Sequence, residues 1–300
     1  MASAARRTTA LIGLTAAALA LLAACSGSNH PAKTNGAAAV SMVPQRILRA
    51  PGSLISATQP QENGAMWMLA GQSSLGLFEM DTSTGRLTGS VSVSGAARSV
   101  AETSTGVIGL ALGTGRSGAL ELLSSMGKVT KTVPLPAPAR QVVVGSDGTT
   151  FYVLTGKAAT ASVSIVGSRA GRVQGSVPMP SDAVSVVPDV PQTTLYALES
   201  NGLVDKIDIA GGKVVAKFKA ASKDDTAQSI ALSPDGSTLY VLKNADGTSN
   251  IADVNLATEA VRKVLPAPSH CVGVLVSTSG GQLYDLVGTP TYGNIQVFAA

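Results

Sequence analysis

Tyrosine recurs at a fixed interval along this chain, and that interval limits the folds available to it. Four of the five tyrosines are 44 residues apart, and the same column continues backwards at spacings of 43 and 42 to a glycine and to the only tryptophan. The column consists of Trp67, Gly109, Tyr152, Tyr196, Tyr240 and Tyr284. A period of this length indicates a repeat architecture, in which each unit is one supersecondary motif.

A second motif follows the same period. A glycine precedes a basic and an apolar residue at Gly85-Arg86-Leu87, Gly127-Lys128-Val129, Gly171-Arg172-Val173 and Gly212-Lys213-Val214, with a degenerate copy at Glu259-Ala260-Val261. Short apolar or alternating segments surround both motifs, for example residues 151–154 and 162–166, and these are typical of strands. We therefore expect four strands in each period.

The turns and the edges of these sheets predict the architecture. The segment Ser233-Pro234-Asp235-Gly236 is typical of a tight hairpin turn between a first and a second strand. An isolated four-stranded sheet would expose two unpaired edges, whereas radial stacking in a closed ring buries its faces and protects those edges. We predict an all-β fold, a β-propeller of about six four-stranded blades, with seven as the alternative. The blades begin near residues 51, 96, 139, 183, 226 and 271.

The two ends of the chain complement each other in this scheme. The sixth blade has no fourth strand, because the chain ends soon after residues 295–298. Residues 45–48 carry the fourth-strand pattern and precede the first blade. We expect this N-terminal strand to pair with the C-terminal blade and close the ring.

The first 24 residues predict an export signal. Arg6 and Arg7 precede an apolar run from Ala10 to Ala24, which is short for a membrane span. The run ends in Leu22-Ala23-Ala24-Cys25, which resembles the lipobox of bacterial lipoproteins and implies a lipid on Cys25. Residues 25–43 then form the lipidated cysteine and a flexible tether, and residues 44–300 the propeller. The expected location is the extracytoplasmic face of the cell membrane, or the outer membrane if the source has one.

One blade carries a family resemblance. Residues 233–244, Ser-Pro-Asp-Gly-Ser-Thr-Leu-Tyr-Val-Leu-Lys-Asn, resemble the YVTN-type propeller repeat of bacterial surface and periplasmic proteins. This resemblance implies a binding or assembly scaffold. Relatives of that type are generally seven-bladed, whereas only six periods fit here.

The charge of the exported chain disfavours nucleic acid as a partner. The 22 basic residues include two in the leader, so the 20 that remain beside 18 acidic residues leave a net charge of +2. The basic residues are scattered along the sequence, whereas a module that binds a duplex concentrates them on one face. We expect a monomer that does not bind nucleic acid.

Strand order predicts where a ligand would bind. The loops between second and third strands, and those between blades, share one mouth of the central channel. Four basic residues of blades two and three belong to this rim: Arg98, Arg116, Arg140 and Lys157. On the opposite side of the mouth we place Asp224, Asp225, Asp246 and His270. Arg98 and Arg140 align with Gln228 at the head of the innermost strand, where a guanidinium pairs well with a carboxylate or phosphate.

The sequence contains no recognisable catalytic set. His270 is the only histidine of the folded part, so a site with several histidines is impossible, and no G-x-S-x-G motif accompanies it. We predict no catalytic residue, metal or cofactor, and we expect Cys271 to be a buried structural thiol without a disulfide partner. The favoured function is a membrane-anchored scaffold that binds a protein, peptide, glycan or small anionic ligand. The alternatives are a propeller enzyme of the lactonase or quinoprotein dehydrogenase type and a structural part of an envelope assembly.

Overall fold

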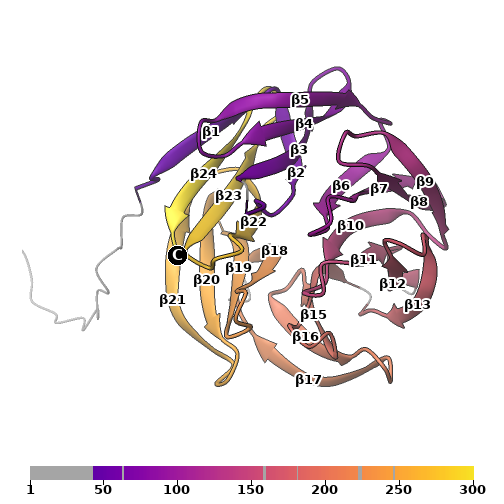
Figure 1. Cartoon of the computed structure of the whole chain (residues 1–300). Coiled ribbons are helices and arrows are strands. Elements are labelled where there is room, and N and C mark those ends of the chain that lie inside the picture. Colours follow the sequence, from indigo (N-terminus) through magenta and orange to yellow (C-terminus); the bar gives the residue numbers. More distant parts are fainter. Residues whose placement is uncertain (1–42, 63, 158–159, 181, 222–224, 246) are drawn as a thin grey trace, which may run out of the picture. The chain divides into compact units, whose positions relative to one another are not determined.

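Six antiparallel four-stranded sheets are arranged around a central axis in the computed structural model of the chain (Figure 1). The structure describes residues 43–300 except 63, 158–159, 181, 222–224 and 246. The predicted leader and most of the predicted tether, including Cys25, therefore lie outside the described residues. The described part contains no helix long and apolar enough to cross a bilayer.

Each blade runs from an innermost strand at the axis to an outermost strand at the rim. Blade 1 contains β2 (Ser53–Ala57), β3 (Ala65–Gly71), β4 (Leu75–Asp81) and β5 (Arg86–Ser92). Blade 2 contains β6 (Ala97–Glu102), β7 (Ile108–Thr114), β8 (Ser117–Leu123) and β9 (Val129–Leu135). Blade 3 contains β10 (Ala139–Val144), β11 (Thr150–Thr155), β12 (Ser162–Gly167) and β13 (Arg172–Pro178).

The remaining blades repeat this order. Blade 4 contains β14 (Ala183–Pro188), β15 (Thr194–Glu199), β16 (Leu203–Asp208) and β17 (Lys213–Lys219). Blade 5 contains β18 (Thr226–Leu232), β19 (Thr238–Ala245), β20 (Thr248–Asn255) and β21 (Ala260–Ala267). Blade 6 contains β22 (Cys271–Val276), β23 (Gln282–Gly288), β24 (Gly293–Ala299) and, from the other end of the chain, β1 (Arg46–Ala50). The prediction of six four-stranded blades is confirmed, and the seven-bladed alternative is wrong.

The predicted closure of the ring is also confirmed. β1 pairs antiparallel with β24, with Leu48 opposite Ile295, and the Gln45 N–H donates to the carbonyl of Val297 at 2.7 Å. Leu48 is buried in the cluster between blades 6 and 1. The two ends of the sequence therefore form one sheet, in which β1 supplies the fourth and outermost strand of blade 6 (Figure 1).

Glycine in the left-handed region forms the turns between first and second strands. Gly64, Gly106, Gly148, Gly236 and Gly280 have φ between 64° and 79°, a conformation that glycine adopts without a steric penalty. In blade 4 the same slot holds a residue with a side chain, Gln192, at a φ of 57°. Its carboxamide oxygen accepts a hydrogen bond from the Tyr152 hydroxyl at 2.9 Å, so this exceptional turn is tied to the neighbouring blade.

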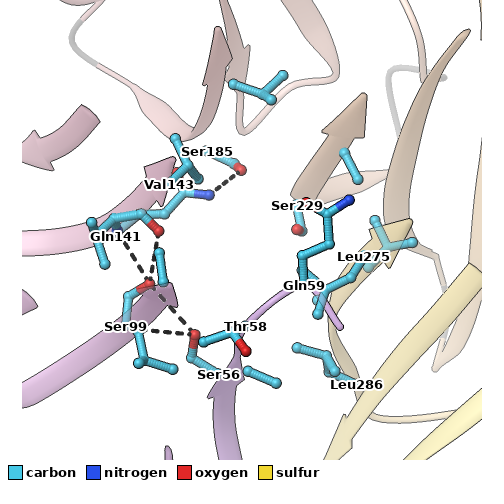
Figure 2. A pocket seen from close by; sticks show the side chains of 18 of the residues that line it. Ser56, Thr58, Gln59, Ser99, Gln141, Val143, Ser185, Ser229, Leu275 and Leu286 are labelled. Atoms are coloured by element: carbon cyan, nitrogen blue, oxygen red, sulfur yellow. Dashed lines mark hydrogen bonds between the residues drawn. The ribbon is translucent and has the colours of Figure 1, made fainter. Parts of the chain in front are cut away.

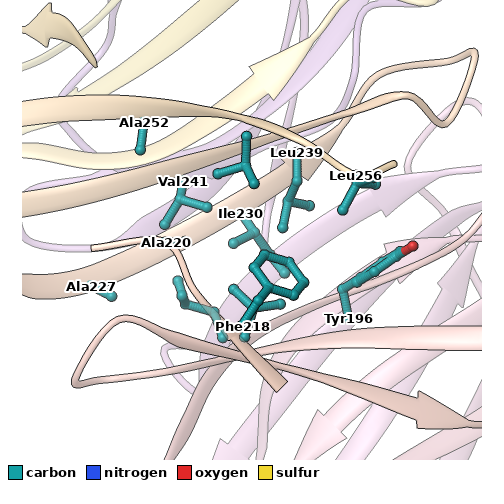
Figure 3. Close-up of a cluster of buried hydrophobic side chains, with 12 residues drawn as sticks. Tyr196, Phe218, Ala220, Ala227, Ile230, Leu239, Val241, Ala252 and Leu256 are labelled. Carbon is teal, nitrogen blue, oxygen red and sulfur yellow. The ribbon is translucent and has the colours of Figure 1, made fainter. Parts of the chain in front are cut away.

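The hydrophobic core lies between successive blades rather than at the axis. Figure 3 shows one such layer, in which Tyr196 and Phe218 of blade 4 pack with Ile230 of blade 5. The aromatic column supplies one large side chain to most of these layers. Blade 2 is the exception, because its column position is Gly109, and there Phe151 of blade 3 fills the space. A Cβ on Gly109 would approach Phe151 to 2.6 Å.

Candidate functional site

The six innermost strands enclose a cavity of about 280 Å³ along the axis. Its walls come from β2, β6, β10, β14, β18 and β22. All six strands begin at the same mouth, because successive strands within each blade are antiparallel. The channel therefore has one mouth at the strand starts and one at the strand ends.

A β-bulge recurs at the same place in every innermost strand. In each blade one residue near the strand start is skipped in the pairing with the second strand. The six skipped residues, which we call the bulge ring, are Ile55, Arg98, Arg140, Val184, Gln228 and Val272. A bulge re-aims its side chain and disrupts the local ladder. All six residues line the channel.

The two arginines of the bulge ring occupy neighbouring blades. Arg98 is exposed, and its Nη1 donates to the carbonyls of Gly95 at 3.1 Å and Ala97 at 2.9 Å. Arg140 is half-buried, and its Nη1 donates to the carbonyl of Ala183 on β14 at 2.9 Å. Burial lowers the pKa of the Arg140 guanidinium, which nevertheless stays charged at neutral pH. Within the described residues neither arginine forms an ion pair with a carboxylate.

The structure brings only part of the predicted rim to the channel. Arg98, Arg140 and Gln228 line it. Arg116 lies in the β7–β8 hairpin, Lys157 follows β11, and both are exposed away from the channel wall.

The acidic side of the predicted rim contributes less. His270 is exposed just before β22, with a φ of 63°, and it does not line the channel. Asp225 is buried and pairs with Lys243 at 2.6 Å. Asp224 and Asp246 lie outside the described residues. Of the predicted rim residues that the structure describes, only those at bulge positions line the channel.

A belt of polar side chains lies immediately below the bulge ring, and the sequence analysis missed it. The innermost strand is a sheet edge, so alternate backbone N–H groups point away from its own blade. In successive blades a side-chain oxygen accepts such an N–H from the next blade: Ser56 from Val100 at 3.2 Å, Ser99 from Val142 at 3.2 Å, Gln141 from Val186 at 2.8 Å, and Ser185 from Ile230 at 3.2 Å. Gln141 Nε2 also donates to Ser185 Oγ at 2.9 Å. Figure 2 shows this belt along one side of the channel.

The sequence did contain a signal for the belt. Aligning the six periods on the bulge places Ser56, Ser99, Gln141, Ser185 and Ser229 in one column, directly before an apolar column. Blade 6 has Gly273 at this position, which has no side chain to offer. The belt therefore has a gap at the blade that closes the ring.

Below the belt the channel becomes apolar and then acidic. Ala101, Val143, Val187, Ala231 and Leu275 line the next level together with Thr58, whose hydroxyl oxygen accepts the N–H of Trp67. At the strand ends Gln59 donates to the carbonyl of Val276 at 2.8 Å.

Glu102 lies at this lower end with its Oε2 buried and without a hydrogen-bond partner among the described residues. Burial, and secondarily the charge of Glu79, raises the pKa of Glu102 to about 7. The channel thus has a cationic mouth at the strand starts and a half-buried carboxyl near the other end.

Blade 6 contains two other ionisable groups, Cys271 of β22 and Asp285 of β23, and neither lines the channel. Cys271 is a buried free thiol, as predicted, and burial and the nearby Asp285 raise its pKa. Asp285 is fully buried, and neither carboxylate oxygen has a hydrogen-bond partner among the described residues. No three His, Cys, Asp or Glu residues of the described part gather in a way that could hold a metal ion.

Comparison with solved structures finds a similar architecture in Kuenenia stuttgartiensis hydrazine synthase. The superposition has a TM-score of 0.62 and covers 82% of this chain and 76% of that chain, at 18% sequence identity. At that identity the likeness shows the propeller fold alone. No protein-family model matches the sequence, and no curated protein matches it.

Proposed function

We propose that this chain is a lipid-anchored, extracytoplasmic β-propeller that binds an anionic ligand or partner at the channel mouth. The observation that carries the proposal is the pair of arginines on adjacent blades at that mouth. Arg98 and Arg140 border a cavity of about 280 Å³ and make no ion pair with a described carboxylate. Each guanidinium keeps donors free for a carboxylate or phosphate, which it can bind in a bidentate manner.

The remainder of the bulge ring suggests the shape of the bound group. Gln228 can donate or accept a hydrogen bond, whereas Ile55, Val184 and Val272 offer apolar contacts. An acidic group with a compact apolar body suits this mixture, whether it belongs to a small molecule, a glycan, a peptide or a protein loop. Small-molecule sites generally combine apolar walls with a few convergent polar groups.

Substitution of the two arginines tests the site. We expect Arg98→Gln with Arg140→Gln to weaken binding of an acidic probe, such as citrate or an Asp-rich peptide, by about 10-fold to 100-fold per lost charged hydrogen bond. Titration calorimetry measures the affinity. The matched control is Arg116→Gln with Lys157→Gln, which removes the same charge outside the channel wall. Equal losses in both double variants would show nonspecific attraction and refute a site at the mouth.

The anchor has a separate test. The four residues Leu22-Ala23-Ala24-Cys25 support lipid attachment at Cys25, and several acyl chains make membrane attachment effectively permanent. Mass spectrometry of the protein extracted from membranes should find a diacylglyceryl group on Cys25. Recovery of an unmodified protein in the soluble fraction would overturn this part of the proposal.

The scaffold role is supported by the resemblance of residues 233–244 to YVTN-type repeats. The rival is a propeller enzyme of the lactonase or quinoprotein dehydrogenase type, which needs a metal or a quinone in the channel. Elemental analysis and an absorbance spectrum of the purified protein separate the two. Stoichiometric metal or a bound quinone would favour the enzyme.

A further inference from the structure

The chain enters the propeller at the face opposite the arginine mouth. β1 is antiparallel to β24, which is antiparallel to β23, which is antiparallel to β22. β22 starts at the arginine mouth, so β1 starts at the other face and ends near the mouth. The tether predicted before Val43 therefore joins the outer rim of blade 6 at the side remote from Arg98 and Arg140.

Basic and aliphatic side chains are exposed where the chain enters. The outermost strands of three adjacent blades, β21, β1 and β5, follow one another along this part of the rim (Figure 1). Ile47 is 54% exposed, Leu87 47% and Val261 40%. We define the rim patch as Arg46, Ile47 and Arg49 of β1, Arg86 and Leu87 of β5, and Val261 of β21.

The charge balance of the patch is positive. Arg46, Arg49 and Arg86 are exposed and make no ion pair within the described residues. The Arg46 guanidinium donates to the carbonyl of Thr82, which leaves its charge uncompensated. β4 carries two carboxylates: Asp81 lies opposite Arg86 and accepts the N–H of Ser83 at 2.7 Å, and Glu79 accepts the hydroxyl of Thr88 at 3.0 Å.

Blade 5 adds further positive charge beside the patch. Arg262 and Lys263 share the single buried carboxylate of Asp253, at 2.7 and 3.7 Å. These three residues together carry one further positive charge. Arg46, Arg49, Arg86, Arg262 and Lys263 carry five positive charges against three negative charges on Glu79, Asp81 and Asp253, and Glu259 is paired with Lys206, so this part of the rim is cationic.

From this arrangement we infer that the rim patch docks on an anionic phospholipid surface and holds the arginine mouth away from the membrane. The inference rests on the proposed anchor at Cys25. The predicted tether comprises the 18 residues from Cys25 to Met42, and a random coil of that length has a root-mean-square reach of about 25 Å. Such a tether keeps the blade 6 rim close to the headgroups. Basic side chains then gain electrostatic attraction, and exposed aliphatic side chains insert at the interface.

A vesicle-binding assay tests the patch without the lipid. The probe is a set of phosphatidylglycerol–phosphatidylcholine vesicles, compared with phosphatidylcholine alone, and the protein is the chain from Ser26, which keeps all the strands of the closed ring. Binding is measured by co-sedimentation with the vesicles. We expect Arg46→Gln/Arg49→Gln/Arg86→Gln to lower the affinity for the anionic vesicles by about 100-fold, or about five-fold per arginine. The matched control is Lys128→Gln/Arg172→Gln/Lys213→Gln, which removes the same charge from exposed residues of turns and outer strands on blades 2, 3 and 4. It should change binding less than five-fold.

Two further variants keep the test decisive. Arg49→Gln/Arg86→Gln leaves the Arg46 contact with Thr82 intact and should lower binding by about 25-fold. Ile47→Ser should also weaken vesicle binding, because it removes an exposed aliphatic side chain. Ile47 is 54% exposed, so we expect this substitution to leave the fold intact. Absence of binding to anionic vesicles, or equal losses in the patch and control triples, would overturn the inference. An absent lipid on Cys25 would overturn the anchor while leaving the vesicle result as it stands.

Discussion

Asp285 of β23 lies where every other blade has an apolar residue. In every blade, the residue that follows the belt position pairs with one residue of the second strand, and in blade 6 that residue is Asp285. In the other five blades it is Met68, Leu110, Val153, Ala197 and Val241. The Asp285 side chain is 0% exposed, and burial raises its pKa from 3.8 to about 7. A charged carboxylate without a partner is costly at such a position. We therefore expect Asp285 to destabilise the closing blade at neutral and alkaline pH.

The pKa shift gives the sign and size of the effect. The folded state favours the protonated form, so the penalty is absent below about pH 4, grows between pH 4 and pH 7, and is fully present above about pH 7. A difference of about three pKa units corresponds to about 4 kcal/mol at pH 8 and about 1.6 kcal/mol at pH 5. The stability of the Asp285→Asn variant relative to the parent should thus increase by about 2.5 kcal/mol from pH 5 to pH 8. Asp285→Val should be the more stable variant at both values, because it also restores an apolar contact.

Urea denaturation of the parent and both variants at pH 5 and pH 8 measures this difference. Glu102, whose pKa is also raised to about 7, titrates in all three proteins, so comparing variant with parent cancels its contribution. If the parent and Asp285→Asn change stability in parallel between the two pH values, the pKa of Asp285 is the same in the folded and the unfolded state. The reasoning from its burial would then be refuted.

Three further predictions concern the contacts between blades. Gly109→Ala should destabilise the protein by about 1–3 kcal/mol through a clash with Phe151, and adding Phe151→Leu should recover part of the loss in the same denaturation assay. Leu48→Ala should cost about 2–4 kcal/mol at the ring closure, whereas Ile47→Ala, on the exposed face of the same strand, should cost less than about 0.5 kcal/mol; equal costs would contradict the closure. Ser99→Ala should cost about 1–3 kcal/mol because it leaves the N–H of Val142 unpaired, and unchanged hydrogen exchange at that amide would argue against the belt.

The period of the sequence was sufficient to predict the architecture. The tyrosine column and the glycine-basic-apolar motif defined six units, and the strand pattern at residues 45–48 predicted its own partner at 295–298. These features are local or periodic, so they can be read along one dimension. The turn glycines were equally predictable, because a positive φ imposes a residue type without reference to the remainder of the fold.

Only the tertiary structure decided which side chains meet. The sequence alignment of the blades placed Arg98, Arg140 and Gln228 at the head of the innermost strand, but it did not reveal the bulge that rotates them into the channel wall, because a one-residue change in pairing is too small for a strand pattern to show. Arg116 and Lys157 lie in loops between second and third strands, and neither lines the channel.

The belt and the exception at Gly109 depend on contacts between blades. Ser99 bonds the backbone of the next blade, 43 residues further along the chain, and Phe151 fills the space left by a glycine one period earlier. The sequence thus determined the number, order and closure of the sheets, because those follow from local strand and turn chemistry. The neighbours of each inward-facing residue were decided by packing between blades, since that packing brings together atoms whose proximity no local pattern specifies.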